Sequence, residues 1–201
     1  MDFFQRAVRP PERLGILPGT FNPITVAHLA IARAALRHVD EVVFVLPRVF
    51  PHKNYSGASF AERLEMLRVA VAGEEAFSAA AADGGLFAEI ARECRAAYGN
   101  EVRLSFLCGR DAAERIVGWD YGRPEALAEM LREFDLLVAG REGPYEVSGE
   151  FGSAVCRLDV IGADGVSATE VRERIARGAP WEHLVPRPAV ERARQIYRSR
   201  A

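Results

Sequence analysis

The chain has 201 residues, a formal net charge of -2, 49% hydrophobic residues and 27% charged residues. This size favours one α/β domain that folds around its own core without a disulfide or a structural metal. The near-neutral charge excludes a broad basic field for nucleic acid or an anionic membrane, so an anionic ligand needs a local site. The 3 cysteines are odd in number and widely spaced, which argues against a disulfide scaffold. This pattern favours a reducing compartment, and we expect the protein in the cytoplasm.

In chain order, short apolar runs alternate with segments of helical periodicity. The runs predict strands at 14–17, 41–46, 77–82, 102–108, 134–139 and 155–161. The first helix has Leu29, Ala32, Leu36 and Val39 on one face. The second has Leu64, Leu67 and Val71 at helical spacing, and further helices are predicted at 86–98, 112–117, 125–132, 168–177 and 188–198.

Strands that are apolar throughout need cover on both faces. Helices between them supply it, which predicts a Rossmann-like parallel sheet flanked by helices on both faces. Ligands bind such sheets beyond the carboxyl ends of the strands, so we look first at the loops that follow Leu17, Leu46, Cys108, Ala139 and Ile161. No apolar stretch approaches the roughly 20 residues that span a bilayer, and the first dozen residues do not have the pattern of a signal peptide.

The loop after the first strand is the first candidate site, and it reads Gly19-Thr20-Phe21-Asn22-Pro23-Ile24-Thr25-Val26-Ala27-His28. Gly19 lets the backbone turn where a side chain would block a ligand. Thr25 is predicted as the N-cap of the next helix, with His28 on the same face of its first turn. Free amides and the positive helix end make an anion site there, and the imidazole can donate to a phosphoryl oxygen. The plainer alternative is a capped helix whose histidine is solvated or satisfied in the core.

A second candidate site opens the helix near the end of the chain. Ser167 and Glu170 predict a capping box, and Gly178 predicts the end of that helix. Ser167, Thr169 and the first-turn amides can bind a triphosphate, with Arg172 one turn along. A well-capped amphipathic helix with solvated arginines is the alternative. The sequence contains neither a P-loop nor G-x-G-x-x-G, so it lacks the phosphate-binding loops expected of a kinase or a dinucleotide-dependent dehydrogenase.

Both sites resemble one family. The first resembles the signature loop of the nucleotidyltransferase superfamily with an H/T-x-G-H motif, here Thr25-Val26-Ala27-His28 with alanine in place of glycine. The second, 166–172, resembles the I-S-S-T-x-x-R motif of nicotinate- and nicotinamide-nucleotide adenylyltransferases, with Ala168 in place of one serine. Further segments resemble the same family: Pro51-His52-Lys53, Gly109-Arg110-Asp111, Trp119 and Arg141. The resemblance implies a single nucleotidyltransferase domain, 1–201, whose C-terminal helices, 167–201, complete the phosphate site.

The activity that the resemblance implies is transfer of AMP from ATP to nicotinate or nicotinamide mononucleotide, with release of pyrophosphate, in NAD biosynthesis. His28, Lys53 and Arg172 would be catalytic, and Mg²⁺ would arrive with ATP and need no cage of protein ligands. ATP and a pyridine mononucleotide would be the partners, with no nucleic acid and no membrane, and the sequence is compatible with an oligomer. The implied ATP-binding residues are Gly19, Thr20, Phe21, Thr25, His28, Gly109, Asp111, Ser167, Thr169 and Arg172.

The acceptor side departs from the family. Bacterial nicotinate-nucleotide enzymes carry S-Y-T-x-x-T where this chain reads Asp83-Gly84-Gly85-Leu86-Phe87-Ala88. The implied acceptor site then consists of backbone amides of Gly84 and Gly85, with Trp119 against the pyridine ring and Arg141 near the nucleotide. The departure keeps two alternatives open: another nucleotidyltransferase, such as a pantetheine-phosphate adenylyltransferase, and a non-catalytic nucleotide-binding regulator. Asp111 has its own alternative, as the N-cap of the following short helix.

Overall fold

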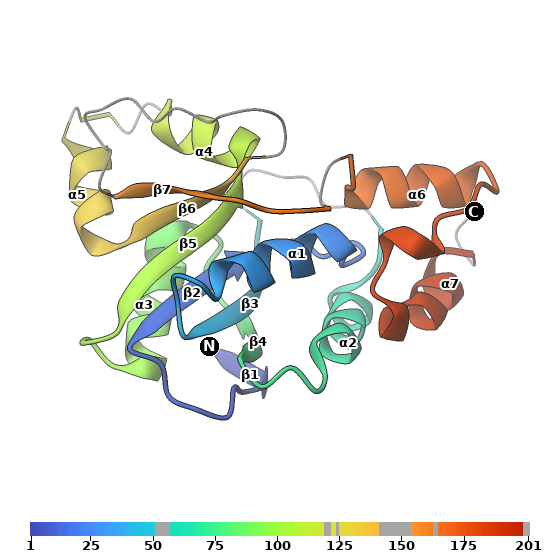
Figure 1. Cartoon of the computed structure of the whole chain (residues 1–201), viewed down its shortest axis with the longest axis horizontal. Coiled ribbons are helices and arrows are strands. Elements are labelled where there is room, and N and C mark those ends of the chain that lie inside the picture. Colours follow the sequence, from blue (N-terminus) through green and yellow to red (C-terminus); the bar gives the residue numbers. More distant parts are fainter. Residues whose placement is uncertain (51–56, 119–121, 124, 141–153, 163–164, 199–201) are drawn as a thin grey trace.

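The computed structural model describes residues 1–50, 57–118, 122–123, 125–140, 154–162 and 165–198. Within these ranges the strands form one sheet in the order β1-β4-β3-β2-β5-β6-β7 (Figure 1). From β4 to β7 all neighbouring strands are parallel. The strands are β1 Asp2–Gln5, β2 Arg13–Pro18, β3 Glu41–Pro47, β4 Phe77–Ala82, β5 Arg103–Gly109, β6 Asp135–Ala139 and β7 Val155–Leu158.

The helices lie between the strands and after the last one. They are α1 Val26–Ala35, α2 Phe60–Val71, α3 Phe87–Tyr98, α4 Arg110–Val117, α5 Ala126–Glu133, α6 Ala168–Ala176 and α7 Val190–Arg198, with short 3-10 turns η2 Glu182–Leu184 and η3 Arg187–Ala189. The predicted alternation of strands and helices is confirmed. The predicted C-terminal ends of one helix and one strand are wrong. Val39 lies buried in the turn after α1 rather than on the helix. Ile161 lies beyond the end of β7 and is 93% exposed.

The first strand, β1, is absent from the prediction and makes the sheet mixed. It pairs antiparallel with β4 at the edge of the sheet. The side-chain amide of Gln5 anchors this strand, because it donates to the carbonyl oxygens of Val71 at 2.8 Å and Phe77 at 3.2 Å. The guanidinium of Arg6 lies over the ring of Phe3 at 4.1 Å. A four-residue edge strand held by such long-range contacts has no periodic pattern of its own.

The sheet has a hydrophobic core on each face. Alternate residues of β3 divide between them: Val42 and Phe44 face α1, α2, α6 and α7, while Val43 and Val45 face α3, α4 and α5. Helices therefore cover both faces, as predicted. Each large apolar side chain buried in this way stabilises the fold by about 1.5–3 kcal/mol. This rigid base holds the loops at the carboxyl edge of the sheet.

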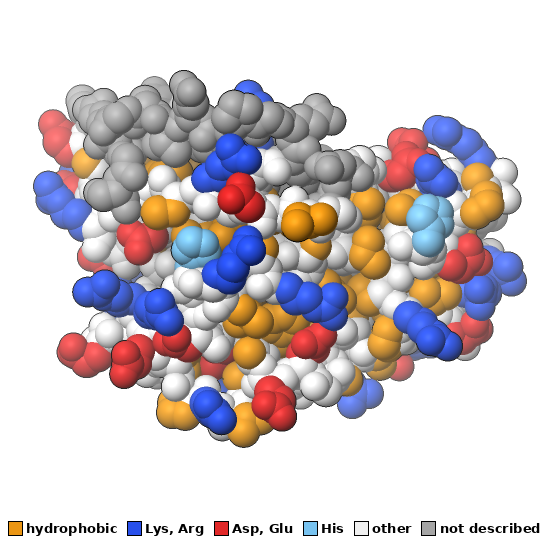
Figure 2. Space-filling view, viewed as in Figure 1, with side chains coloured by type: hydrophobic (Ala, Val, Ile, Leu, Met, Phe, Trp, Pro, Cys, Tyr) orange, Lys and Arg blue, Asp and Glu red, His pale blue; other side chains and the backbone are white. Residues whose placement is uncertain are grey.

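The charges on one face of the described part of the molecule are mixed in sign (Figure 2). On the face seen in Figure 2, basic and acidic side chains are interspersed, in keeping with the net charge of -2. Among the helices that the structure describes, none combines the length and the apolar character needed to cross a membrane.

Candidate active site

The loop from β2 to α1 is held in an unusual backbone conformation. Phe21 has a φ of 45°, a region that costs a bulky residue about 1–3 kcal/mol. Its ring is 1% exposed, so packing in the core holds it there. A Cβ added to Gly19 would lie 2.9 Å from Cε1 of Phe21. Glycine is therefore needed at position 19 because the ring covers it, whereas we expected a ligand to need that space.

His28 is oriented from two sides at the start of α1. Thr25 is the N-cap, as predicted, and its backbone N–H donates to Nδ1 of His28 at 3.0 Å. Because Nδ1 accepts this hydrogen bond, the neutral ring carries its proton on Nε2. The ring of Phe21 meets the imidazole edge-on, with 5.2 Å between ring centroids. The side chain is half-buried, and its contacts with Thr25 and Phe21 orient it at the helix N-terminus.

The helix near the end of the chain begins and ends where predicted, within a residue. Ser167 is the N-cap of α6, and its hydroxyl accepts from the N–H of Glu170 at 3.1 Å. The carboxylate of Glu170 accepts from Nε of Arg174 at 2.5 Å, so an ion pair replaces the return half of the predicted capping box. Gly178, with a φ of 68°, donates its N–H to the carbonyl of Ile175 at 3.1 Å and ends the helix.

The two candidate turns meet in space, which confirms the expectation that they share one edge of the sheet. Nη1 of Arg172 donates to the backbone carbonyl oxygen of Asn22 at 2.6 Å. Nη2 of the same guanidinium donates to Oγ1 of Thr169 at 3.1 Å. Arg172 thus joins the first turn of α6 to the loop that leads into α1. The arrangement gathers two helix N-termini, an imidazole donor and a guanidinium, which is suited to binding a chain of phosphates.

Asn22 lies at the centre of this junction and was not singled out from the sequence. It is 3% exposed. Its side-chain Oδ1 accepts from the hydroxyl of Tyr197 at 2.5 Å and from the N–H of Ala58 at 3.3 Å. A Cβ added to Gly57, which has a φ of 123°, would lie 2.6 Å from Nδ2 of Asn22. The loop therefore rests against α7 and against the chain just before α2.

A second arginine, on α2, also holds this loop. Nη1 of Arg63, on α2, donates to the backbone carbonyl of Thr20 at 3.0 Å. Arg63 is 3% exposed, and its guanidinium lies 5.3 Å from the ring centroid of Phe50. The signal that could have found this residue is an arginine at helical spacing from Met66 and Leu67, on the otherwise apolar buried face of α2. Carbonyls at positions 20 and 22 thus each accept from an arginine on a different helix.

The predicted use of Gly84 and Gly85 needs correction. Their backbone amides, expected to face an acceptor, are already bound within the protein. The N–H of Gly84 donates to Oε1 of Glu93 at 2.9 Å, and the N–H of Gly85 donates to Oε2 of Glu89 at 2.9 Å. Both carboxylates belong to α3, so side chains of this helix satisfy the amides of the turn that precedes it. The hydrogen bonds from Leu86 and Gly85 hold the pKa of Glu89 below its ordinary value.

Of the remaining predicted site residues, the structure describes some and leaves others outside its described ranges. Gly109 is the N-cap of α4. Asp111 therefore lies inside α4 rather than at its N-cap, and its side chain is outside the description. Lys53, Trp119 and Arg141 also lie outside the described residues.

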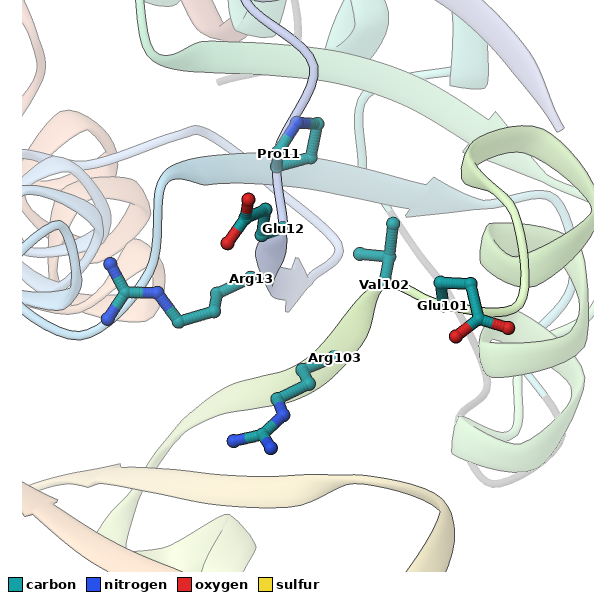
Figure 3. Close-up of a pocket in the computed structure, with 6 residues that line it drawn as sticks. All are labelled: Pro11, Glu12, Arg13, Glu101, Val102 and Arg103. Atoms are coloured by element: carbon teal, nitrogen blue, oxygen red, sulfur yellow. The ribbon is translucent and has the colours of Figure 1, made fainter.

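A cavity of about 510 Å³ lies away from this junction. Figure 3 shows its lining at the beginnings of β2 and β5, which is the amino edge of the sheet. Both signs of charge line it, so it has no clear preference for an anion. The lining residues are Pro11, Glu12, Arg13, Glu101, Val102 and Arg103.

Comparisons with known proteins agree with the geometry. The family model for cytidylyltransferase-like proteins matches residues 16–174. The chain is 33% identical over 196 residues to a protein of Gloeobacter violaceus named "Probable nicotinate-nucleotide adenylyltransferase", covering 89% of this chain and 92% of that one. It is 34% identical over 203 residues to a protein of the same name from Citrifermentans bemidjiense, covering 87% and 92%.

A solved structure shares the fold. It is the nicotinic acid mononucleotide adenylyltransferase of Plasmodium falciparum complexed with NaAD, which superposes with a TM-score of 0.68 over 91% of this chain and 95% of that one. At 15% identity this likeness concerns the fold alone. The identity and coverage of the sequence relatives assign the family. The chain belongs to the cytidylyltransferase-like family, and within it to the nicotinate-nucleotide adenylyltransferases.

Proposed function

We propose that this enzyme transfers AMP from ATP to nicotinate mononucleotide, or to nicotinamide mononucleotide, and releases pyrophosphate in NAD biosynthesis. The observation that carries the proposal is the hydrogen bond from Arg172 to the carbonyl of Asn22, because it makes one phosphate-binding junction from two distant turns. The names of the relatives supply the acceptor class. We place the reaction in the cytoplasm, in keeping with the free cysteines Cys94, Cys108 and Cys156.

The reaction requires little from the protein beyond the positioning of its two substrates. An oxygen of the acceptor's 5′-phosphate attacks the α-phosphorus of ATP, a new P–O bond forms, and the bond to the β-phosphate oxygen breaks to release pyrophosphate. The nucleophile is already an anion at neutral pH, so no general base is required. Catalysis then comes from alignment of the two substrates and from donors aimed at the charge of the transition state.

Each group at the junction has a proposed part in that alignment. His28 would donate from Nε2 to a non-bridging oxygen of the α-phosphate. Arg172, the hydroxyls of Ser167 and Thr169 and the first-turn amides of α6 would hold the β- and γ-phosphates, helped by Lys53. Phe21 and Thr25 are buried, so we assign them to the orientation of His28 rather than to contact with ATP. Thr20, Gly109 and Asp111 remain proposed contacts of the nucleotide at the carboxyl edge, whereas the ring of Phe21 covers Gly19.

Magnesium belongs to the substrate in this proposal. In the part of the chain that the structure describes, no group of three or more His, Cys, Asp or Glu side chains could hold a metal ion. Phosphate oxygens and water are the ligands that Mg²⁺ commonly takes in such reactions. The ion would arrive with ATP and help neutralise the charge of the triphosphate, and the C-terminal segment 167–201 of the single domain 1–201 would complete the site that binds the complex.

The test is pyrophosphate release from ATP and Mg²⁺ with one acceptor at a time: nicotinate mononucleotide, nicotinamide mononucleotide or phosphopantetheine. We expect release with a pyridine mononucleotide, and comparing the first two acceptors decides between the acid and the amide. Release with phosphopantetheine alone would indicate the other adenylyltransferase. ATP binding without release in any of the three mixtures would indicate a nucleotide-binding regulator.

A further inference from the structure

The hydroxyl of Tyr197 reaches the proposed phosphate site from the last turn of α7. It donates to Oδ1 of Asn22 at 2.5 Å, across 175 positions of sequence. Tyr197 is 6% exposed and Asn22 is 3% exposed. Water therefore has little access to replace this hydrogen bond if it is removed.

Asn22 connects this hydroxyl to the guanidinium of Arg172. Its backbone carbonyl accepts from Arg172, while its side-chain oxygen accepts from Tyr197 and from the N–H of Ala58. The backbone of Gly57 packs against the amide group, where even a Cβ would lie only 2.6 Å from Nδ2. A fixed side-chain amide restrains the peptide that carries the carbonyl, so the orientation of Asn22 decides where Arg172 is held.

The position of α7 itself does not depend on this hydroxyl. Nε and Nη2 of Arg192 both donate to Oε2 of Glu65 on α2, at 2.8 and 2.5 Å. Ala193 and Ile196, on α7, are buried in the hydrophobic core that also contains residues of α1 and α2. Figure 1 shows α7 beside α2 and α6 at one end of the molecule. Removing only the oxygen of Tyr197 therefore leaves the helix anchored and isolates the contact with Asn22.

We infer that Tyr197 is a positioning residue for the binding of ATP. Its hydroxyl fixes Asn22, and the carbonyl of Asn22 aims the guanidinium of Arg172 at the triphosphate. The inference rests on the role proposed for Arg172. It extends the phosphate site to a third segment of the chain, because α7 contributes without touching the ligand.

The chain offers a matched control in Tyr98. That tyrosine also donates its hydroxyl to a mostly buried group, the carboxylate of Glu41, which in turn accepts from Ser78. Glu41 and Ser78 lie at the beginnings of β3 and β4, at the amino edge of the sheet. Tyr98→Phe thus removes a similar hydrogen bond far from the proposed phosphate site.

The experiment measures the Kd of a non-hydrolysable ATP analogue with Mg²⁺ by calorimetry, together with KM and kcat, for the wild type, Tyr197→Phe, Arg172→Ala, the double variant and Tyr98→Phe. We expect Tyr197→Phe to raise Kd and the KM for ATP by about three- to tenfold, with a smaller change in kcat. The same substitution should add nothing to the Kd of Arg172→Ala. Tyr98→Phe should lower the melting temperature and leave Kd unchanged.

The outcomes separate this inference from the proposed function. If Tyr197→Phe lowers only the melting temperature, or raises Kd by the same factor with and without Arg172, the hydroxyl is structural and the inference is overturned. If Arg172→Ala leaves Kd unchanged, the proposed role of Arg172 is overturned as well.

Discussion

The guanidinium of Arg172 donates to the backbone carbonyl of Asn22 at 2.6 Å, although 150 positions separate the two residues. This contact brings the start of α6 against the loop that ends at His28. One site therefore depends on both ends of the chain, and a change at either end should affect the same ligand. The predictions below follow from that dependence.

His28→Ala is expected to reduce kcat by about 100- to 1000-fold, since it removes one oriented transition-state donor. ATP binding should change much less, because the remaining groups still hold the β- and γ-phosphates. Steady-state rates of pyrophosphate release check this, with His38→Ala, at an exposed histidine after α1, as the control. Turnover of His28→Ala close to the wild type would refute the assignment.

Arg172→Lys keeps the positive charge but loses the planar fork that reaches both Asn22 and Thr169. We expect the Kd for ATP to rise by about tenfold, which is the scale of one charge-assisted hydrogen bond. Arg177→Lys, at the exposed end of the same helix, should bind ATP like the wild type. Equal affinity of the wild type and Arg172→Lys would show that charge alone matters at this position.

Gly57→Ala should damage the site as well as the backbone. Both Gly57 and Gly73 have a positive φ, of 123° and 84°, so alanine strains either position. Only at Gly57 does the new Cβ meet Asn22, at 2.6 Å, whereas nothing lies within 4 Å at Gly73. We expect both variants to lose thermal stability and only Gly57→Ala to raise the KM for ATP. A similar KM in the two variants would contradict the role given to Asn22.

Glu89→Gln should weaken the turn that precedes α3. The N–H groups of Leu86 and Gly85 stabilise the ionised carboxylate and lower its pKa. The stability it contributes is therefore present above the unfolded-state value of about 4.3 and is lost as the pH falls through the lowered folded-state value. Melting temperatures from pH 7 down to pH 3 should fall less steeply for Glu89→Gln than for the wild type. Parallel curves would count against this contribution, and Glu75→Gln, at an exposed residue outside the turn, is the control.

The cysteines should differ in reactivity. Burial raises the pKa of both Cys94 and Cys108 to about 12, whereas Cys156 is half-exposed. Because the thiolate is the reactive form, alkylation at pH 8 should modify Cys156 first and the other two only on unfolding. The raised pKa values also contribute stability that is complete below the unfolded value of about 8.5 and is lost as the pH rises towards 12. Mass spectrometry of the alkylated peptides checks the order, and early modification of Cys108 would contradict its burial.

The sequence predicts those parts of the molecule that have a local pattern. Continuous apolar runs such as Val42 to Leu46 predict a buried strand, because both faces of that strand need cover. Thr25 and Ser167 predict helix starts, because a hydroxyl before an amphipathic segment satisfies free amides. These local patterns are enough to place both candidate turns at one edge of the sheet.

Contacts between distant side chains have no such pattern. Nothing in the local sequence around Asn22 indicates that Tyr197 and Arg172 meet it. The carboxylates that take the amides of Gly84 and Gly85 come from one and two turns inside α3, so the sequence alone left those amides available to a ligand. These contacts arise from the packing of whole helices on the sheet, and they decide which groups of the site are oriented.

Hydrogen exchange with a non-hydrolysable ATP analogue and Mg²⁺ tests most directly whether the two turns form one phosphate site. We predict that ligand protects the amides of 19–28 and of 167–172 together, and that Arg172→Ala reduces the protection of both segments. Protection of one segment without the other, or protection confined to the cavity lined by Arg13 and Arg103, would contradict a shared site.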